Sequence, residues 1–231
     1  MDLNDLILLR NRAPSWFQHL ADVALPAASF GFQSYPSGAI TLGLVKNHHP
    51  GEERWFHTFY PGLNLKRFNN LQVDFGLRVS NPDVMSKGLG PTCGIYDPLP
   101  DALPSDYLEF LSLSNGARLF SSHLYFFGVR TELGGNATIN RQPYELSHAN
   151  VFDRPKWSDP SLVFIGGYGW DRSLLVMTSA SERVTRREAV SGAQLKQWGS
   201  FSNMLVSECD RLIKRFDNEG SLVDRSIATT P

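Results

Sequence analysis

Cysteine is scarce in this sequence, and a signal-peptide pattern is missing. Among 231 residues there are two cysteines, Cys93 and Cys209, and they do not form a CxxC pair. Two distant cysteines favour free thiols in a reducing compartment over a disulfide framework. At the N-terminus, Asp2 and Asp5 precede only a short apolar run at 6–9, which differs from the basic start and longer apolar core of a signal peptide. We therefore expect a cytoplasmic protein.

Long apolar runs and an excess of either charge are also missing. No stretch approaches the roughly 18 apolar residues that span a bilayer. The 22 basic and 23 acidic residues give a formal charge of -1, which provides no global field toward nucleic acid or anionic lipid. We expect neither a nucleic acid nor a membrane as partner. The content of hydrophobic residues, 42%, is enough for one substantial core and argues against intrinsic disorder over most of the chain.

The N-terminal part is expected to contain a helix followed by a hairpin. Apolar residues recur every fourth position from Trp16 to Ala24, which is the spacing of one helical face. Further on, residues 30–34 and 39–45 flank a Tyr-Pro-Ser-Gly sequence at 35–38. Proline presets such a turn and glycine tolerates positive φ, so the two flanking segments are predicted to pair as β-strands.

Three segments follow before the next predicted strand pair. Residues 48–54 are polar and are expected to form a loop. Residues 65–75 carry apolar side chains at helical spacing and precede Gly76, which is typical of a helix that ends in a left-handed residue. Residues 80–100 hold several prolines and glycines without periodicity, so we expect an irregular connection there.

A short helix and a series of strands are predicted in the second half. Ser105 is expected to be the N-cap of a helix that stops at Asn115-Gly116. The aromatic and aliphatic stretches that follow are typical of strands packed on helices. The strands are predicted at 117–122, 123–130, 161–165 and 173–177, with a tight turn at 166–169 and a further strand near 183–186.

The C-terminal region is expected to form a long amphipathic helix. From about Ser202 onward, Leu205, Cys209 and Leu212 share one helical face, which places the Cys209 thiol in the core. Residues from 218 onward are polar and aperiodic, so we interpret them as a tail.

Five sequence segments in this order resemble the bacterial SUKH superfamily, which includes immunity proteins and domains like the yeast cell-wall assembly regulators. The segments are FYPGLNLKRFNNL, LPSDYLEFLSLSNGARLF, LYFFGVR, FIGGYGWDRSLLV and WGSFSNMLVSECDRLIKRFDNEG. The resemblance covers about residues 58–220. It divides the chain into an N-terminal addition at 1–57, a SUKH-like domain at 58–217 and a tail at 218–231. The connection at 80–100 is longer than the family pattern.

The resemblance implies an α+β fold with a curved, mostly antiparallel sheet packed against several helices, preceded here by a helix-hairpin addition. It also implies a protein that binds another protein without catalysis. Members of the family neutralise toxins of neighbouring bacteria, so a polymorphic toxin domain is the expected partner. An intracellular scaffold or regulatory role is the main alternative. A small-molecule-binding or hydrolytic enzyme is a third hypothesis.

The predicted hairpin at 161–177 holds the best candidates for partner contact. Tyr168, Trp170, Asp171 and Arg172 combine large aromatic groups with an opposed charge pair, and these residue types dominate interface energies. Trp157 is a second candidate. Because tryptophan is usually largely buried, core packing beneath a sheet edge is the competing interpretation for both tryptophans.

The remaining reactive side chains are assigned structural roles, and we predict no catalytic residue, metal ligand or cofactor. The glycines at 166–169 precede an apolar strand, whereas a phosphate loop leads into a helix. The histidines and acids at 48–57 lack HxxxH or HExxH spacing, and Cys93 lacks an activating basic context. Asp106 and Glu109 are explained by capping and solvation. The basic group Arg183, Arg186, Arg187 and Lys196 is interpreted as a solvated strand edge before a helix rather than a nucleic-acid site.

Overall fold

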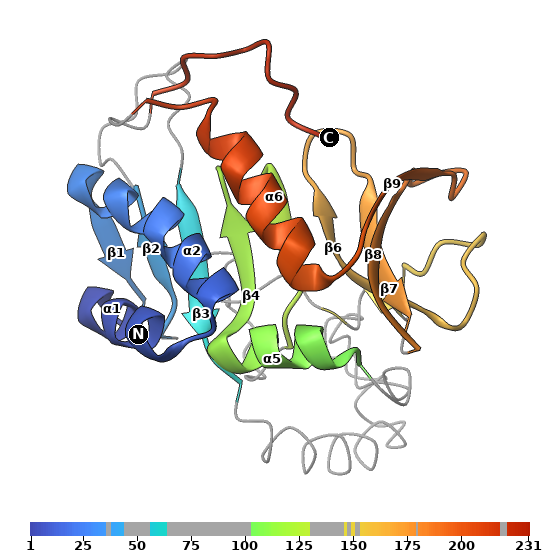
Figure 1. The fold of residues 1–231 in the computed structure, drawn as a ribbon, viewed down its shortest axis with the longest axis horizontal. Helices are drawn as coiled ribbons and strands as arrows, with labels where there is room; N and C mark the ends of the chain where they lie inside the picture. The colour runs from blue at the N-terminus through green and yellow to red at the C-terminus, as the bar shows by residue number, and fades with distance from the viewer. Residues whose placement is uncertain are drawn as a thin grey trace, which may run out of the picture.

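The computed structural model describes residues 1–35, 38–43, 56–63, 103–129, 146, 149–150, 153–178, 180–217 and 221–231. Within them, nine strands form one sheet in which each strand pairs antiparallel with the next in sequence (Figure 1). The strands are β1 (Phe32–Ser34), β2 (Ile40–Leu42), β3 (His57–Pro61), β4 (Ser114–Leu119), β5 (Leu124–Phe126), β6 (Leu162–Tyr168), β7 (Leu174–Thr178), β8 (Ser181–Arg187) and β9 (Gln194–Trp198). The predicted α+β class is confirmed.

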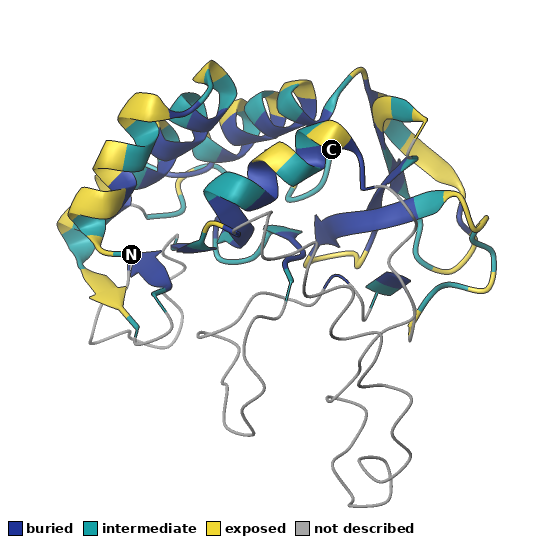
Figure 2. Cartoon of the chain, turned by 90° about the horizontal axis from the view of Figure 1, so that it is seen from below, coloured by how far each residue is buried: buried dark blue, intermediate teal, exposed yellow. Residues whose placement is uncertain are grey.

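The helices form a second layer over one face of this sheet (Figure 2). In the described residues they are α1 (Leu3–Arg12), α2 (Ser15–Ala24), the 3-10 helix η1 (Leu25–Phe30), α5 (Ser105–Leu113) and α6 (Phe201–Ile213). Their exposed residues point outward, while their buried residues face the strands. Because all of them use the same sheet face, one continuous core lies between the two layers.

An aromatic cluster fills the centre of this core. The ring of Phe201, at the start of α6, lies 5.2 Å from Phe110 of α5 and 5.3 Å from Phe126 of β5, measured between ring centroids. Trp16 of α2 approaches the same ring edge-on at 6.1 Å. Such edge-to-face contacts add to the stabilisation from burial alone. Phe201 therefore connects three helices and the sheet.

The N-terminal helices follow local signals in the sequence. α2 spans the residues whose periodicity predicts it, and its buried side chains include Phe17 and Leu20. α1 is not among the predicted helices, although Asp2 and Asp5 form a capping box at its start, with both side chains accepting backbone N–H groups at 2.8 Å. A capping box is a readable start signal for a helix.

Two predictions about α5 are wrong. Ser105 is not the N-cap, because the helix is preceded by Pro104 and has no side-chain capping bond. The helix ends at Leu113, and Asn115-Gly116 lies inside β4 instead of at the helix terminus. There the Asn115 amide donates to the Val129 carbonyl and accepts its N–H, both at 2.7 Å. The Asn115 side chain is therefore hydrogen-bonded to the segment at Val129, which follows β5, and is not part of the helix terminus.

The predicted tight turn at 166–169 is also misplaced. Gly166 and Gly167 belong to β6, opposite Phe126 and Tyr125 of β5. A Cβ atom on Gly166 would lie 2.2 Å from the Tyr125 carbonyl oxygen, so the absence of a side chain permits a close approach of two strands. The actual turn begins at Gly169.

The C-terminal helix begins one residue before its predicted start, at Phe201, with Ser200 as N-cap. Cys209 is buried on its inner face, as predicted. The strand predicted near 183–186 is β8, and it is not an edge, because β9 pairs with it from Val184 to Arg187. No strand had been predicted at β9, whose residues are mostly polar and exposed.

The N-terminal elements share the sheet and core with the rest of the chain. β3 pairs with β2 on one side and with β4 on the other, so the predicted division near residue 57 falls within a continuous sheet. The described helices include none that is long and apolar enough to cross a membrane. The predictions at 48–54, 65–75 and 80–100 fall outside the described residues.

Candidate functional site

Three turns gather at one end of the sheet. They connect β4 to β5, β6 to β7 and β8 to β9, and we call this region the turn end. The register places Leu124 opposite Tyr168 and Leu174 opposite Arg187, which brings the three turns side by side. The turn between β6 and β7, residues 169–173, is the middle one. Four of the five sequence-predicted contact residues lie in it or directly before it.

Trp170 is the most prominent apolar side chain of the middle turn. It is 75% exposed, whereas tryptophan is usually largely buried. Core packing, the competing interpretation, therefore does not apply to Trp170. Val190 in the neighbouring β8–β9 turn is 85% exposed. The turn end thus presents two large apolar side chains to solvent from adjacent turns.

The backbone of the middle turn is fixed by hydrogen bonds on both sides of Trp170. The Tyr168 N–H donates to the Ser173 carbonyl at 2.9 Å, and the Ser173 N–H donates to Asp171 Oδ1 at 2.9 Å. The Gly169 N–H donates to the His123 carbonyl of the β4–β5 turn at 3.3 Å. Arg172 occupies the left-handed region with φ of 58°. These bonds hold the exposed indole on an ordered support.

Arg186 of β8 holds the same turn through its side chain. Its Nε donates to Ser173 Oγ at 2.8 Å, and its Nη2 forms an ion pair with the Asp171 carboxylate. Burial raises the pKa of Asp171, but the hydrogen bonds from Ser173 and the charge of Arg186 outweigh it and leave this pKa below its usual value. Asp171 and Arg172 both lie exposed on this turn, and the ion-pair partner of Asp171 is Arg186 of β8.

Tyr168 cannot contribute to an exposed surface, which corrects its place among the candidates. Its side chain is fully buried on the sheet face that carries α6, and burial raises the pKa of its hydroxyl well above the usual range. The Arg186 guanidinium lies over its ring at 5.3 Å from the centroid. Tyr168 thus supports the turn from below while Trp170 projects from it.

Trp157 is half-buried and packs against the β8–β9 turn. Its Nε1 donates to the Ala189 carbonyl at 2.9 Å, and Arg187 lies over its ring at 5.9 Å. Its ring also packs against Phe164 of β6, with the centroids 5.8 Å apart. This arrangement matches the packing interpretation, because the polar atom of the indole is already used inside the molecule.

Arg186 and Arg187 are engaged in internal contacts, so the predicted solvated edge is wrong for these two basic residues. Arg186 is buried, and Arg187 donates to the Gly192 carbonyl at 2.9 Å. The Lys196 Nζ lies 3.5 Å from the fully buried Glu208 of α6, and 4.8 Å from the centre of the Trp198 ring. Arg183 is exposed. A broad basic footprint, which nucleic-acid binding requires, is not present among these four residues.

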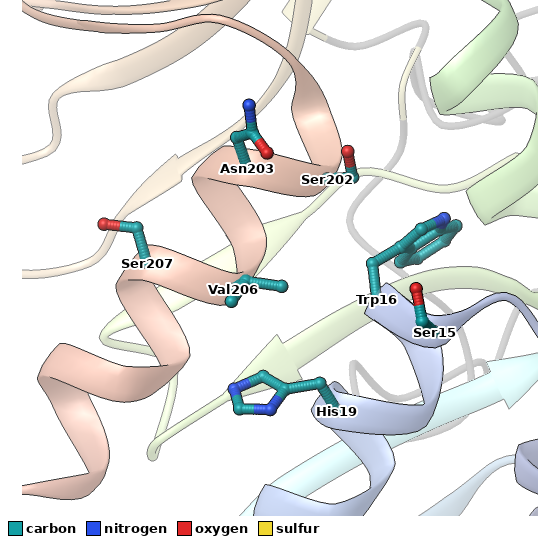
Figure 3. A pocket seen from close by; sticks show the side chains of 7 residues that line it. All are labelled: Ser15, Trp16, His19, Ser202, Asn203, Val206 and Ser207. Carbon is teal, nitrogen blue, oxygen red and sulfur yellow. The ribbon is translucent and has the colours of Figure 1, made fainter.

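A separate shallow groove lies between α2 and α6 on the outer face of the helical layer (Figure 3). Its volume is about 590 Å³, and it is lined by Ser15, Trp16, His19, Ser202, Asn203, Val206 and Ser207. The His19 side chain extends from α2 toward α6 beneath Val206. There its Nε2 lies 2.8 Å from Asp210 Oδ1.

The groove offers polar contacts but no assembled nucleophile. A hydrolase of the serine type needs a hydroxyl within hydrogen-bond reach of the histidine. Within the described residues, none of the groove serines is hydrogen-bonded to His19, and Ser202 Oγ lies instead 2.9 Å from Ser200 Oγ. The described part of the chain also holds no group of three side chains suited to a metal ion. The groove residues gave no motif that the sequence could have revealed, because they come from two distant helices.

His57, the described one of the histidines and acids at 48–57, is a core residue. It opens β3, is fully buried, and packs its ring against Phe120 at 4.8 Å between centroids. Burial lowers its pKa to about 3. The other histidines and acids at 48–57, and Cys93, lie outside the described residues.

Three comparisons with known proteins were negative. No protein-family model matches the chain, and neither the curated proteins nor the solved structures contain a significant match.

Proposed function

We propose that this protein is a non-catalytic protein-binding domain of the SUKH type, and that it acts as an immunity protein that neutralises a cognate bacterial toxin by stoichiometric binding. The observation that carries the proposal is the exposure of Trp170 on an ordered turn. The resemblance of the sequence to the SUKH superfamily supplies the class of partner.

Leaving the apolar surface of the Trp170 side chain in water is unfavourable. Its side chain is 75% exposed and contributes little to the core, so the apolar area remains to be buried by a partner. Tryptophan is among the residues that dominate binding energy, and truncating such an anchor typically costs about 2 kcal/mol or more. Because the turn is already hydrogen-bonded, little ordering entropy is lost on docking.

The turn end also surrounds Trp170 with groups that give orientation. Arg172 is exposed beside it, and Val190 projects from the next turn. An apolar centre with a polar rim is the usual anatomy of a protein interface. The proposed docking surface therefore consists of Trp170, Asp171, Arg172 and Val190.

The test uses the product of the toxin gene adjacent to the gene of this protein. Titration calorimetry should give one-to-one binding in the nanomolar range, and Trp170→Ala should weaken it at least tenfold, which corresponds to about 1.4 kcal/mol. The matched control is Phe32→Ala, which removes another exposed aromatic side chain, from β1. Phe32→Ala should bind like the unmodified protein.

Two outcomes contradict the proposal. A neighbourhood without a toxin gene, together with several cellular partners recovered through Trp170, would favour the scaffold alternative. Unchanged toxin binding by Trp170→Ala would remove the turn end as the docking surface.

A further inference from the structure

The last described residues, 221–231, form a strap that crosses from the end of α6 to the turn end (Figure 1). The strap begins on the last residues after α6. Leu222 forms a bridge with Phe216, and the Val223 N–H donates to the Arg215 carbonyl at 2.8 Å. The composition of residues 218–231 predicts a polar tail. In the structure it contacts the folded domain at three places.

The middle of the strap is held by Arg211 of α6. Its Nε donates to Glu208 Oε2 at 3.0 Å, while Nη1 donates to the Ala228 carbonyl and Nη2 to the Thr229 carbonyl at 3.4 Å. One guanidinium therefore connects a buried carboxylate with two strap carbonyls. A planar fork of donors suits such a multiple contact.

The end of the strap reaches the Arg186 guanidinium, which holds the middle turn at 169–173. Nη1 of Arg186 donates to the Pro231 oxygen, while its Nε and Nη2 contact Ser173 and Asp171. Arg186 is only 6% exposed. Three segments that are distant in sequence therefore meet on one desolvated side chain, and one of them is the turn that carries Trp170.

We infer that the strap braces the Trp170 turn, with Arg186 as the positioning residue that couples the two. If Pro231 leaves, a buried N–H group loses its acceptor, which is costly in a desolvated site. Arg186 then regains a partner by turning toward water, and the contacts to Asp171 and Ser173 are weakened. The order of the turn depends on the strap. The importance of this order for docking rests on the proposed function, whereas the brace itself does not.

The experiment measures the turn without any partner. Heteronuclear NOE values of the backbone amides at 170–172 and of the Trp170 indole are compared between the full chain and a variant that lacks residues 228–231. The NOE values at these positions should fall from those of the adjacent strands to those of a mobile loop. The backbone order parameters of the same amides should be below about 0.6. The amides of β7 and of α2 should stay unchanged, which separates local release from general destabilisation.

A pair of point variants tests the coupling residue. Arg186→Gln should mobilise the same amides in the full chain, and Arg183→Gln, an exposed arginine on the same strand, should not. If Arg186→Gln does not fold, the shortened variant still decides, because it keeps every side chain of the turn. Unchanged NOE values at 170–172 after removal of 228–231 would overturn the inference.

Toxin binding provides a separate readout. The shortened variant should bind the toxin at least fivefold more weakly than the full chain. If the full chain does not bind the toxin, the proposed function fails, yet the NOE comparison still tests the brace.

Discussion

A Cβ atom on Gly192 would lie 2.4 Å from Cδ2 of the Trp157 indole, so the β8–β9 turn has no room for a side chain at this position. The same glycine has a φ of 73°, which side-chain-bearing residues rarely adopt. Its carbonyl accepts the Arg187 side chain. Glycine at 192 is thus required by both conformation and packing.

We expect Gly192→Ala to destabilise the protein by about 2 to 4 kcal/mol, because left-handed strain and overpacking act together. Urea unfolding followed by circular dichroism measures the change. The control is Gly199→Ala, where the nearest atom to the new Cβ is Asn203 Nδ2 at 3.6 Å. This control should stay within about 0.5 kcal/mol of the unmodified protein. Equal effects of the two substitutions would contradict the packing described for Trp157.

Glu208 is a fully buried carboxylate that forms ion pairs with Lys196 and Arg211. Both partners remain partly exposed, so we expect Glu208→Ala to cost about 2 to 3 kcal/mol, near the lower end for a broken buried pair. Asp210→Ala on the same helix removes a carboxylate that is 54% exposed and pairs with His19. It should cost about 1 kcal/mol or less. If Asp210→Ala proves the more damaging of the two, the ion pairs of the buried Glu208 contribute less to stability than the exposed pair of Asp210 with His19.

His57 makes the stability depend on pH. Its pKa is lowered to about 3 by burial, whereas the unfolded chain binds the same proton near pH 6.5. Between these values the unfolded state holds more protons, so this contribution is fully present above pH 6.5 and is lost as the pH falls toward 3. The slope approaches 1.4 kcal/mol per pH unit. Urea midpoints at pH 7, 6 and 5 measure it.

His57→Leu should flatten this dependence in the window above pH 5, where most carboxylates do not yet titrate. The comparison is made between the slopes of the two proteins, because the substitution also changes the stability at neutral pH. Parallel slopes would show that His57 is accessible to protons in the folded state.

Cys209 is predicted to be unreactive in the folded protein. Burial raises the pKa of its thiol well above the usual value, and the nearby Asp210 and Glu208 charges act in the same direction. Since the thiolate is the reacting species, a thiol reagent should modify it only after unfolding. The measurement uses Cys93→Ser, which leaves Cys209 as the remaining cysteine, with and without guanidinium chloride. Rapid labelling under native conditions would place Cys209 outside the core.

Elements with a strong local period were predictable. The apolar faces of α2 and α6 follow a helical repeat, so both limits of α2 and the start of α6 were found to within one residue, whereas α6 ends at Ile213, before the predicted start of the tail at 218. A helical face depends on neighbours three and four positions away, and the sequence alone therefore places Cys209 inside. The α1 capping box is an equally local signal, but α1 has a weak apolar face, so hydrophobic periodicity does not predict this helix.

The candidate site was predictable only in part. Its location in the segment around Trp170 follows from residue types, because tryptophan and arginine near a turn indicate a surface contact. The exposure of Trp170 and the burial of Tyr168, two positions away, do not follow from them. These depend on α6, which covers the Tyr168 side of the sheet.

What the sequence by itself determined is the presence of α2, α5 and α6, most strands and the class of the fold, since hydrophobic periodicity acts over a few residues. The tertiary structure alone decided that Asp171 pairs with Arg186, that Gly166 allows β5 and β6 to approach, and that Pro231 accepts a hydrogen bond from Arg186. Each of these contacts joins segments that are far apart in sequence, where hydrophobic periodicity gives no information about which residues meet. Only strand register and the packing of α6 bring them together.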